Sequence, residues 1–99
     1  MLRVDSMEEN THVVHDERGQ KFIVVIGGED CIMAYTEMND FIEIHQFIVT
    51  TDSAKDILLK AAFEFAKSSN RHISDENEDV RKFVMKNPEF ADTARPIAY

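Results

Sequence analysis

A single change of hydrophobic period, near residue 50, constrains the fold more than any other feature of this sequence. Before it, three apolar runs rich in β-branched and aromatic residues are separated by short turn-forming segments. After it, apolar residues recur every three or four positions, which is the spacing of an amphipathic helix. The change predicts strands followed by helices. At 99 residues, the chain is long enough for one domain and too short for two.

The first half of the chain predicts an antiparallel meander. The expected strands are 12–15, 21–26, 31–38 and 41–49. Residues 27–30 are expected to form the hairpin turn, because the paired glycines Gly27 and Gly28 adopt positive φ without steric cost. Asn39 and Asp40 supply the next turn. Three consecutive strands joined in this way form the meander.

Alternation along the last of these strands predicts which side chains reach the core. It places Ile42, Ile44 and Ile48 on one face, because successive side chains of a strand point to opposite sides. The other face carries Phe41, Glu43, His45 and Phe47. A helix over 53–68 is expected to cover the isoleucines. Its predicted buried residues are Leu58, Ala61, Ala62 and Phe65.

The remaining chain predicts a short strand and a second helix. The strand is expected at 71–73, and the helix starts at a cap formed by Asp75 or Asn77. Pro88 ends that helix. A strand on each side of the first helix implies a mixed sheet, and so an α+β (mixed α/β) fold. The expected organisation is a flexible arm over 1–11, one domain over 12–93 and a tail over 94–99.

Composition argues against several classes of function. Eleven basic and 19 acidic residues give a net charge of −8, so attraction to a phosphate backbone has the wrong sign and no nucleic-acid partner is expected. No apolar run approaches the roughly 18–20 residues that cross a bilayer, and the acidic start of the chain is unlike a secretory signal. No membrane partner is therefore expected. The single Cys31 cannot form an internal disulfide, which indicates a reducing, cytoplasmic compartment.

Titratable side chains within an apolar strand are the main candidates for catalysis. His45 lies in the run 44–47, where burying a polar ring without a partner would cost about 1–3 kcal/mol. Glu43 shares its face, so the two residues could handle a proton together. The alternative is a structural histidine bonded to a neighbour. No metal site is expected, because His12 and His15 point to opposite faces of a strand.

Three stretches give the sequence a resemblance to a known family. They are the strand FIEIHQFIV, the helix ILLKAAFEFAKSSN with its paired apolar residues and alanines, and the ending VRKFVMKNPEFAD with its Pro-Glu-aromatic-Ala-Asp segment. In the order meander, helix, short strand and helix, residues 14–92 resemble the short, stand-alone GNAT-like (YjdJ-type) N-acetyltransferases. The resemblance implies a GNAT-like sheet, and transfer of acetyl from acetyl-CoA to a small-molecule or protein amine.

The resemblance also implies where the cofactor and the chemistry lie. The strand 41–49 would line the pantetheine arm, and the helix amides after it would bind the pyrophosphate. The cofactor residues implied are Phe47, Ile48, Val49, Thr50, Thr51, Asp52, Ser53, Ala54, Lys55 and Asn77. His45 or Glu43 would be the general base, while backbone amides would stabilise the oxyanion.

The sequence departs from the family's pattern in the cofactor loop. VTTDSAKD has none of the family's Gly, Arg or Pro residues and is about three residues shorter, which removes part of an amide cradle. Asn77 stands where the family has a cysteine, and Gln46 where it has a threonine. The residues alone favour an ordinary N-cap by Thr51, Asp52 or Ser53, since Asp52 would repel a phosphate. A second hypothesis is therefore a catalytically inactive GNAT-like domain that binds CoA or a protein.

Overall fold

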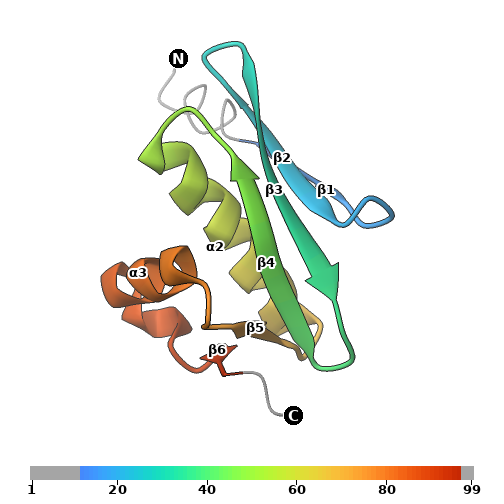
Figure 1. Ribbon diagram of the computed structural model, residues 1–99, viewed down its shortest axis with the longest axis vertical. Coiled ribbons are helices and arrows are strands. Elements are labelled where there is room, and N and C mark those ends of the chain that lie inside the picture. Colours follow the sequence, from blue (N-terminus) through green and yellow to red (C-terminus); the bar gives the residue numbers. More distant parts are fainter. Residues whose placement is uncertain (1–11, 97–99) are drawn as a thin grey trace, which may run out of the picture.

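The computed structural model describes residues 12–96 of the chain (Figure 1). In chain order the elements are β1 (Val13–Asp16), β2 (Lys21–Ile26), β3 (Glu29–Glu37), β4 (Phe41–Ile48), α2 (Asp52–Ser68), β5 (His72–Ser74), α3 (Glu78–Lys86), the 3-10 helix η1 (Pro88–Phe90) and β6 (Ala94–Arg95). The expected arm 1–11 and the last residues of the expected tail, 97–99, lie outside the described residues.

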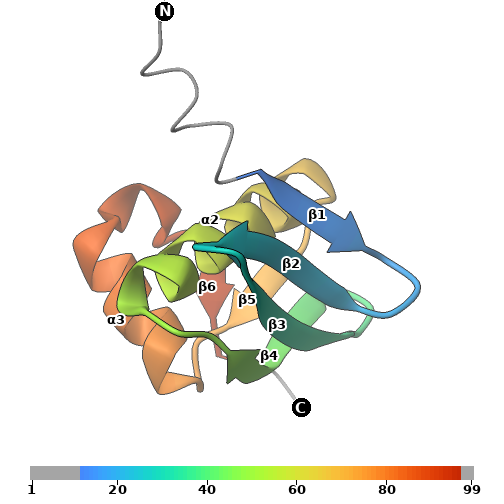
Figure 2. The same cartoon turned by 90° about the horizontal axis from the view of Figure 1, so that it is seen from above.

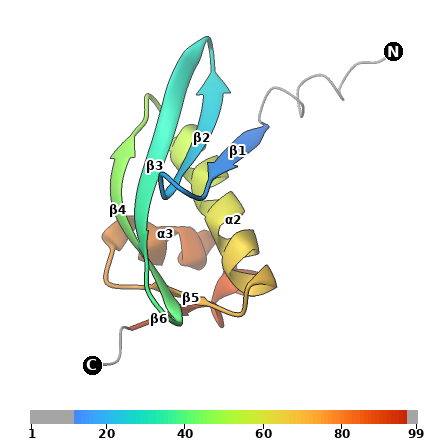
Figure 3. The ribbon, with the colours of Figure 1, turned by 90° about the vertical axis from the view of Figure 1, so that its right-hand side faces the viewer.

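The six strands form one sheet in the order of the chain. β1 to β4 are antiparallel, whereas β4, β5 and β6 are parallel to one another. Both helices cover the same face of the sheet and leave the other face open (Figures 2 and 3). The mixed α/β fold predicted from the change of period is confirmed, including the parallel pair of strands joined through α2. None of the described helices is long and apolar enough to span a bilayer.

The turn between β2 and β3 has the geometry expected of its glycines. Gly27 and Gly28 have φ angles of +62° and +81°, and both are required to be positive in the tightest hairpin turn. The turn leads directly into the pair Ile26 and Glu29, so it fixes the register of β2 and β3 from one end.

β4 contains a β-bulge at His45. Tyr35 of β3 pairs with Ile44, and Ala34 pairs with Gln46, so His45 is an extra residue without a partner in the ladder. An extra residue reverses the alternation of side chains along the rest of the strand. It also leaves its own backbone groups outside the regular hydrogen-bond pattern.

The bulge corrects the predicted faces of β4. Ile42 and Ile44, before the bulge, are buried as predicted. The prediction that Ile48 shares their face is wrong, because Ile48 lies beyond the bulge and its side chain is 55% exposed. Phe47, predicted on the opposite face, packs against the core instead.

The buried face of α2 also differs from the prediction. Its buried residues are Ala54, Leu58, Leu59, Ala62, Phe63 and Ala66. Ala61 and Phe65, predicted to be buried, are only half-buried. Phe63 is fully buried instead, and its ring lies 5.3 Å from the rings of both Phe83 and Phe90, measured between centroids. The buried face of α2 differs from the predicted one because α2 packs against α3 and η1 as well as against the sheet.

A sixth strand occupies the start of the expected tail. Ala94 and Arg95 form β6, which pairs in parallel with Ile73 and Ser74 of β5. The predicted boundary at residue 93 therefore falls immediately before a strand, and two residues of the expected tail belong to the sheet. A two-residue strand is too short to have a period, so no sequence pattern predicts it.

Candidate functional site

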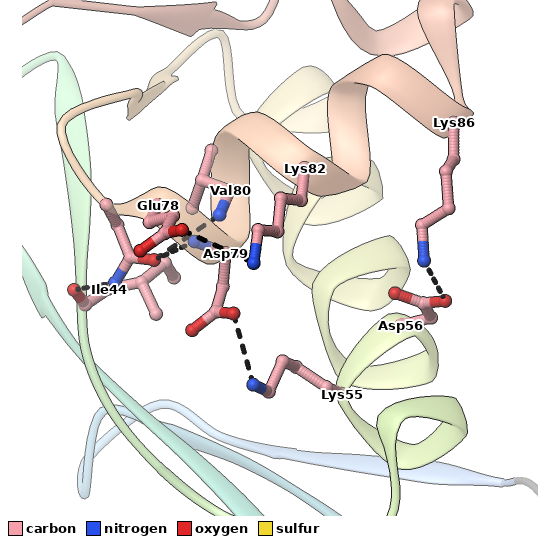
Figure 4. A network of polar contacts seen from close by, with 9 residues as sticks. Ile44, Lys55, Asp56, Glu78, Asp79, Val80, Lys82 and Lys86 are labelled. Atoms are coloured by element: carbon pink, nitrogen blue, oxygen red, sulfur yellow. Dashed lines mark hydrogen bonds and ion pairs between the residues drawn. The ribbon is translucent and has the colours of Figure 1, made fainter.

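β4 and β5 are joined at one end only. Phe41 pairs with His72 and Ile42 with Ile73. β5 ends directly afterwards, whereas β4 continues to Ile48 (Figure 1). Among residues 12–96, no strand therefore lies beside the edge of β4 beyond Ile42 on the β5 side. Figure 4 shows that the first turn of α3 and the side of α2 border this edge.

Asn77 connects the open edge of β4 to the start of α3. Its Nδ2 donates to the carbonyl oxygen of Ile44 at 3.2 Å. Its Oδ1 accepts from the backbone N–H groups of Asp79 at 2.8 Å and Val80 at 3.3 Å, which makes it the N-cap of α3. The prediction that Asp75 or Asn77 caps this helix is thus settled in favour of Asn77. One side chain bonds both structures that border the gap between β4 and β5.

The junction between β4 and α2 is short and capped by its own threonine. Thr51 Oγ1 accepts from the N–H of Ala54 at 3.1 Å, which is the N-cap that the sequence predicted as one of three choices. Lys55, one turn into α2, bonds Asp79 of α3 at 3.1 Å (Figure 4). Its Nζ also lies 5.2 Å from the centroid of the Phe47 ring, within the range of a cation–π contact.

A polar cleft of about 170 Å³ lies between α2 and α3. We call it the α2–α3 cleft; its lining residues are Asp52, Lys55, Asp56, Asp79, Lys82, Phe83 and Lys86. A second ion pair crosses it, between Lys86 and Asp56 at 2.8 Å (Figure 4). Lysines and aspartates are equal in number here, so a phosphate entering the cleft would compete with carboxylates for each ammonium group.

The two predicted general-base candidates lie outside the cleft, on the open face of the sheet. His45 is exposed, and its Nε2 bonds the hydroxyl of Thr36 on β3. Glu43 pairs with Thr36 across the two strands, so both candidates are neighbours of one threonine. Within residues 12–96, the other ring nitrogen of His45 has no hydrogen-bond partner. The ring thus has a nitrogen available to accept a proton from solvent or from a ligand.

The structure brings some predicted cofactor residues together and separates others. Lys55, Phe47 and Asn77 surround the open edge of β4 and the mouth of the α2–α3 cleft. Ile48 and Thr50 are exposed, and the bulge directs Ile48 to the open face of the sheet.

Five cleft residues were missing from the sequence prediction: Asp56, Asp79, Lys82, Phe83 and Lys86. The two lysines are four residues apart, so they lie on one face of α3. That spacing was available in the sequence. What was missing is the information that this face turns toward α2 rather than toward solvent.

Comparison with known proteins gives one structural match. No family model matches the sequence, and no curated protein matches it. Among solved structures, the chain is similar to the solution structure of a "GCN5-like putative N-acetyltransferase" from Staphylococcus aureus, with a TM-score of 0.64 and 18% sequence identity. The alignment covers 91% of this chain and 93% of that chain. The fold is GNAT-like. The GNAT-like sheet expected from the sequence is therefore confirmed, and at this identity the likeness concerns the fold alone.

Two side chains with shifted pKa values lie away from the cleft: His15 on β1 and Tyr35 on β3. Burial, together with Glu37 and Glu17, raises the pKa of Tyr35 to about 12. Burial lowers the pKa of His15 from its ordinary value of 6.5, although Glu17, Glu37 and Asp16 oppose this effect. His15 Nε2 and the Tyr35 hydroxyl oxygen lie 2.5 Å apart. At neutral pH the pair therefore consists of an un-ionised phenol and a mostly neutral imidazole.

The raised pKa of Tyr35 predicts a loss of stability at high pH. The pKa of about 12 in the folded protein is above the ordinary value of 10.0, so the stability from the neutral phenol is complete below pH 10 and is lost as the pH rises toward 12. Phenolate absorbance should show a late titration, and Tyr35→Phe should remove it. If both tyrosines of the chain titrate together near their ordinary value, the buried environment of Tyr35 is wrong.

Proposed function

We propose that this protein is an acetyl-CoA-dependent N-acetyltransferase, which transfers acetyl to the amine of a small molecule or protein. The observation that carries the proposal is the free edge of β4, which borders a lysine-containing cleft at the start of a long helix. The GNAT-like fold supports it. Assignment to the YjdJ-type subgroup and a cytoplasmic location are parts of the same proposal.

The described residues fit a cofactor with an amide-containing arm and phosphates. The Ile44 carbonyl accepts a hydrogen bond from a side chain, Asn77, which a cofactor amide can replace. Lys55, Lys82 and Lys86 line the cleft, where phosphates can take the place of their carboxylate partners. The first amides of α2 carry partial positive charge beside them. Bound there, acetyl-CoA would supply an acetyl group activated as a thioester.

The residues around the bulge would manage the proton and the developing charge. An amine is mostly protonated at neutral pH and must lose a proton before it attacks. His45 would accept that proton, and Glu43, which pairs with Thr36 across the strands, is the alternative base. His45 is the extra residue of the bulge, and its backbone N–H would stabilise negative charge on the acetyl oxygen. The acceptor amine would approach from the open face of the sheet.

A catalytically inactive GNAT-like module is the second candidate, and the contacts across the gap favour it. The bond from Asn77 to Ile44 and the ion pair of Lys55 with Asp79 both close the space that a cofactor would need. Asp52 adds a carboxylate at the start of α2, and its negative charge opposes the attraction of the helix N-terminus for a phosphate. In this alternative the cleft is an internal packing contact, and function depends on a partner protein or on weak CoA binding.

Calorimetry with CoA tests the cofactor binding that an acetyltransferase requires. We expect CoA to bind, and Asp52→Asn to tighten binding about two- to fivefold, because removing a carboxylate from the first turn of a helix is worth roughly 0.3–1 kcal/mol to a nearby phosphate. The gain should shrink as salt is added. Glu89→Gln removes the same charge from an exposed position in η1 and should leave the affinity unchanged. Absence of CoA binding to both the parent and Asp52→Asn, with the fold intact, would favour a protein-interaction module.

A further inference from the structure

A second cavity lies on the other side of α2, between that helix and the first two strands. Its volume is about 580 Å³, within the range of about 300–1,000 Å³ typical of small-molecule pockets. Its apolar walls come from Val13 of β1, Phe22 of β2, and Ile57, Ala61 and Phe65 of α2. The three α2 residues are spaced four apart, so they form one stripe along the helix. Such a wall suits an elongated or flat apolar ligand.

Aromatic rings form one end of this cavity. The ring of His15 is stacked on Phe22, with centroids 4.1 Å apart and planes 8° from parallel. The ring of Phe65 meets His15 edge-on at 4.4 Å. Aromatic pairs prefer such offset and edge-to-face arrangements, and an incoming ring can join them in the same way. The geometry therefore favours a flat aromatic guest over a branched aliphatic one.

Among the described residues, His15 is one of four polar residues that line this cavity, with His12, Lys60 and Glu64. One ring nitrogen of His15, Nε2, bonds the Tyr35 hydroxyl. Within residues 12–96 the other nitrogen has no hydrogen-bond partner. A mostly neutral imidazole can donate or accept with that nitrogen, depending on its tautomer. A ligand with one hydroxyl or N–H group can therefore bond to it.

The charges around the cavity disfavour an anionic ligand. Glu17, Glu37 and Asp16 all act on His15, and their negative charges would repel a carboxylate placed beside it. Lys60 and Glu64, which also line the cavity, are one residue of each sign, so they add no net charge. An uncharged molecule meets no such opposition.

We propose that this cavity binds a small, uncharged aromatic molecule carrying one hydroxyl or N–H group, which bonds to His15. The site is distinct from the proposed acetyl-transfer site. The cavity lies over β1 and β2, and two strand spacings, about 10 Å, separate β2 from the open edge of β4. The cavity is also lined by a different face of α2 from the one that borders α3.

Phenol is the minimal probe, and amide chemical shifts of the full chain provide the measurement. We expect saturable shifts centred on Val13, Ala61 and Phe65, with contacts from the phenol ring to the Ala61 methyl group in nuclear Overhauser spectra. Benzoate has the same ring with a negative charge, so it should bind at least tenfold more weakly. Shifts that do not saturate, that centre on the α2–α3 cleft, or that are equal for benzoate would overturn the proposal.

A cavity-filling variant gives a second test. Ala61→Phe places a ring in the cavity and should weaken phenol binding at least tenfold. The matched control is Ala91→Phe, the same substitution at an exposed position after η1, which should bind phenol like the parent. Equal phenol affinity in a folded Ala61→Phe would refute the site. If that variant does not fold, the localisation of the shifts and the benzoate comparison in the parent protein still decide the outcome.

Discussion

Replacing Phe63 with alanine is expected to lower the free energy of unfolding by about 3–5 kcal/mol. Phe63 is fully buried, and its ring lies 5.3 Å from the rings of Phe83 and Phe90. The substitution removes the ring at which α2, α3 and η1 meet. It therefore creates a cavity and removes two aromatic contacts. A domain of this size typically has only about 5–15 kcal/mol of stability in total, so the loss should be large in a denaturant titration.

Phe65→Ala is the matched control for this prediction. It is the same substitution two residues away on the same helix, but the Phe65 side chain is only half-buried and packs near His15 and Phe22. Less apolar area is lost and solvent can fill the space, so a smaller destabilisation is expected. A loss for Phe65→Ala equal to or greater than that for Phe63→Ala would mean that the face of α2 is wrongly assigned.

Much of the fold followed from local patterns. The strand at 21–26 has the bounds that its apolar, β-branched residues predicted, and α2 begins one residue before the predicted 53–68. Both depend on chemistry within a few residues of each boundary: the glycines of the turn after β2, and Thr51 as the cap of α2. Each of these features depends only on residues that are close in sequence, so the sequence alone could predict it.

The errors share a different cause. The bulge at His45 depends on how β3 and β4 align, and no property of β4 alone requires it. The side of α2 that carries Phe63 is buried because Phe83 and Phe90, about 20 or more residues later, pack against it. Periodicity shows that α2 has an apolar face. It does not show whether Phe63 or Phe65 lies nearer the middle of that face.

In the candidate site, too, local features could be predicted and contacts between distant segments could not. The sequence could identify Asn77 as a cap, because capping is local. It could not predict that the amide of Asn77 also reaches the Ile44 carbonyl, or that Lys55 pairs with Asp79, since both contacts join segments more than 20 residues apart. The α2–α3 cleft is made of such contacts. The sequence contains its three lysines, but nothing in the sequence indicates that they line one cleft.

The largest expected effect on activity comes from His45→Gln. If His45 is the general base, this variant should lower the rate of acetyl transfer to a panel of amines by about 10²–10⁴-fold. Its stability should be close to that of the parent, because His45 is exposed and glutamine can still bond the hydroxyl of Thr36. Affinity for CoA should also persist, since the side chain lies on the open face of the sheet and not in the α2–α3 cleft.

Two further variants separate the role of His45 from a general effect of substitution. His72→Gln makes the same change at the paired ends of β4 and β5, away from the bulge, and should transfer acetyl at the parental rate. Glu43→Gln should lose less transfer activity than His45→Gln if His45 is the base; a larger loss would make Glu43 the base. Unchanged transfer by His45→Gln would exclude its side chain from the mechanism. A loss of folding without a specific loss of transfer would return His45 to a structural role, in which its bond to Thr36 orders the bulge.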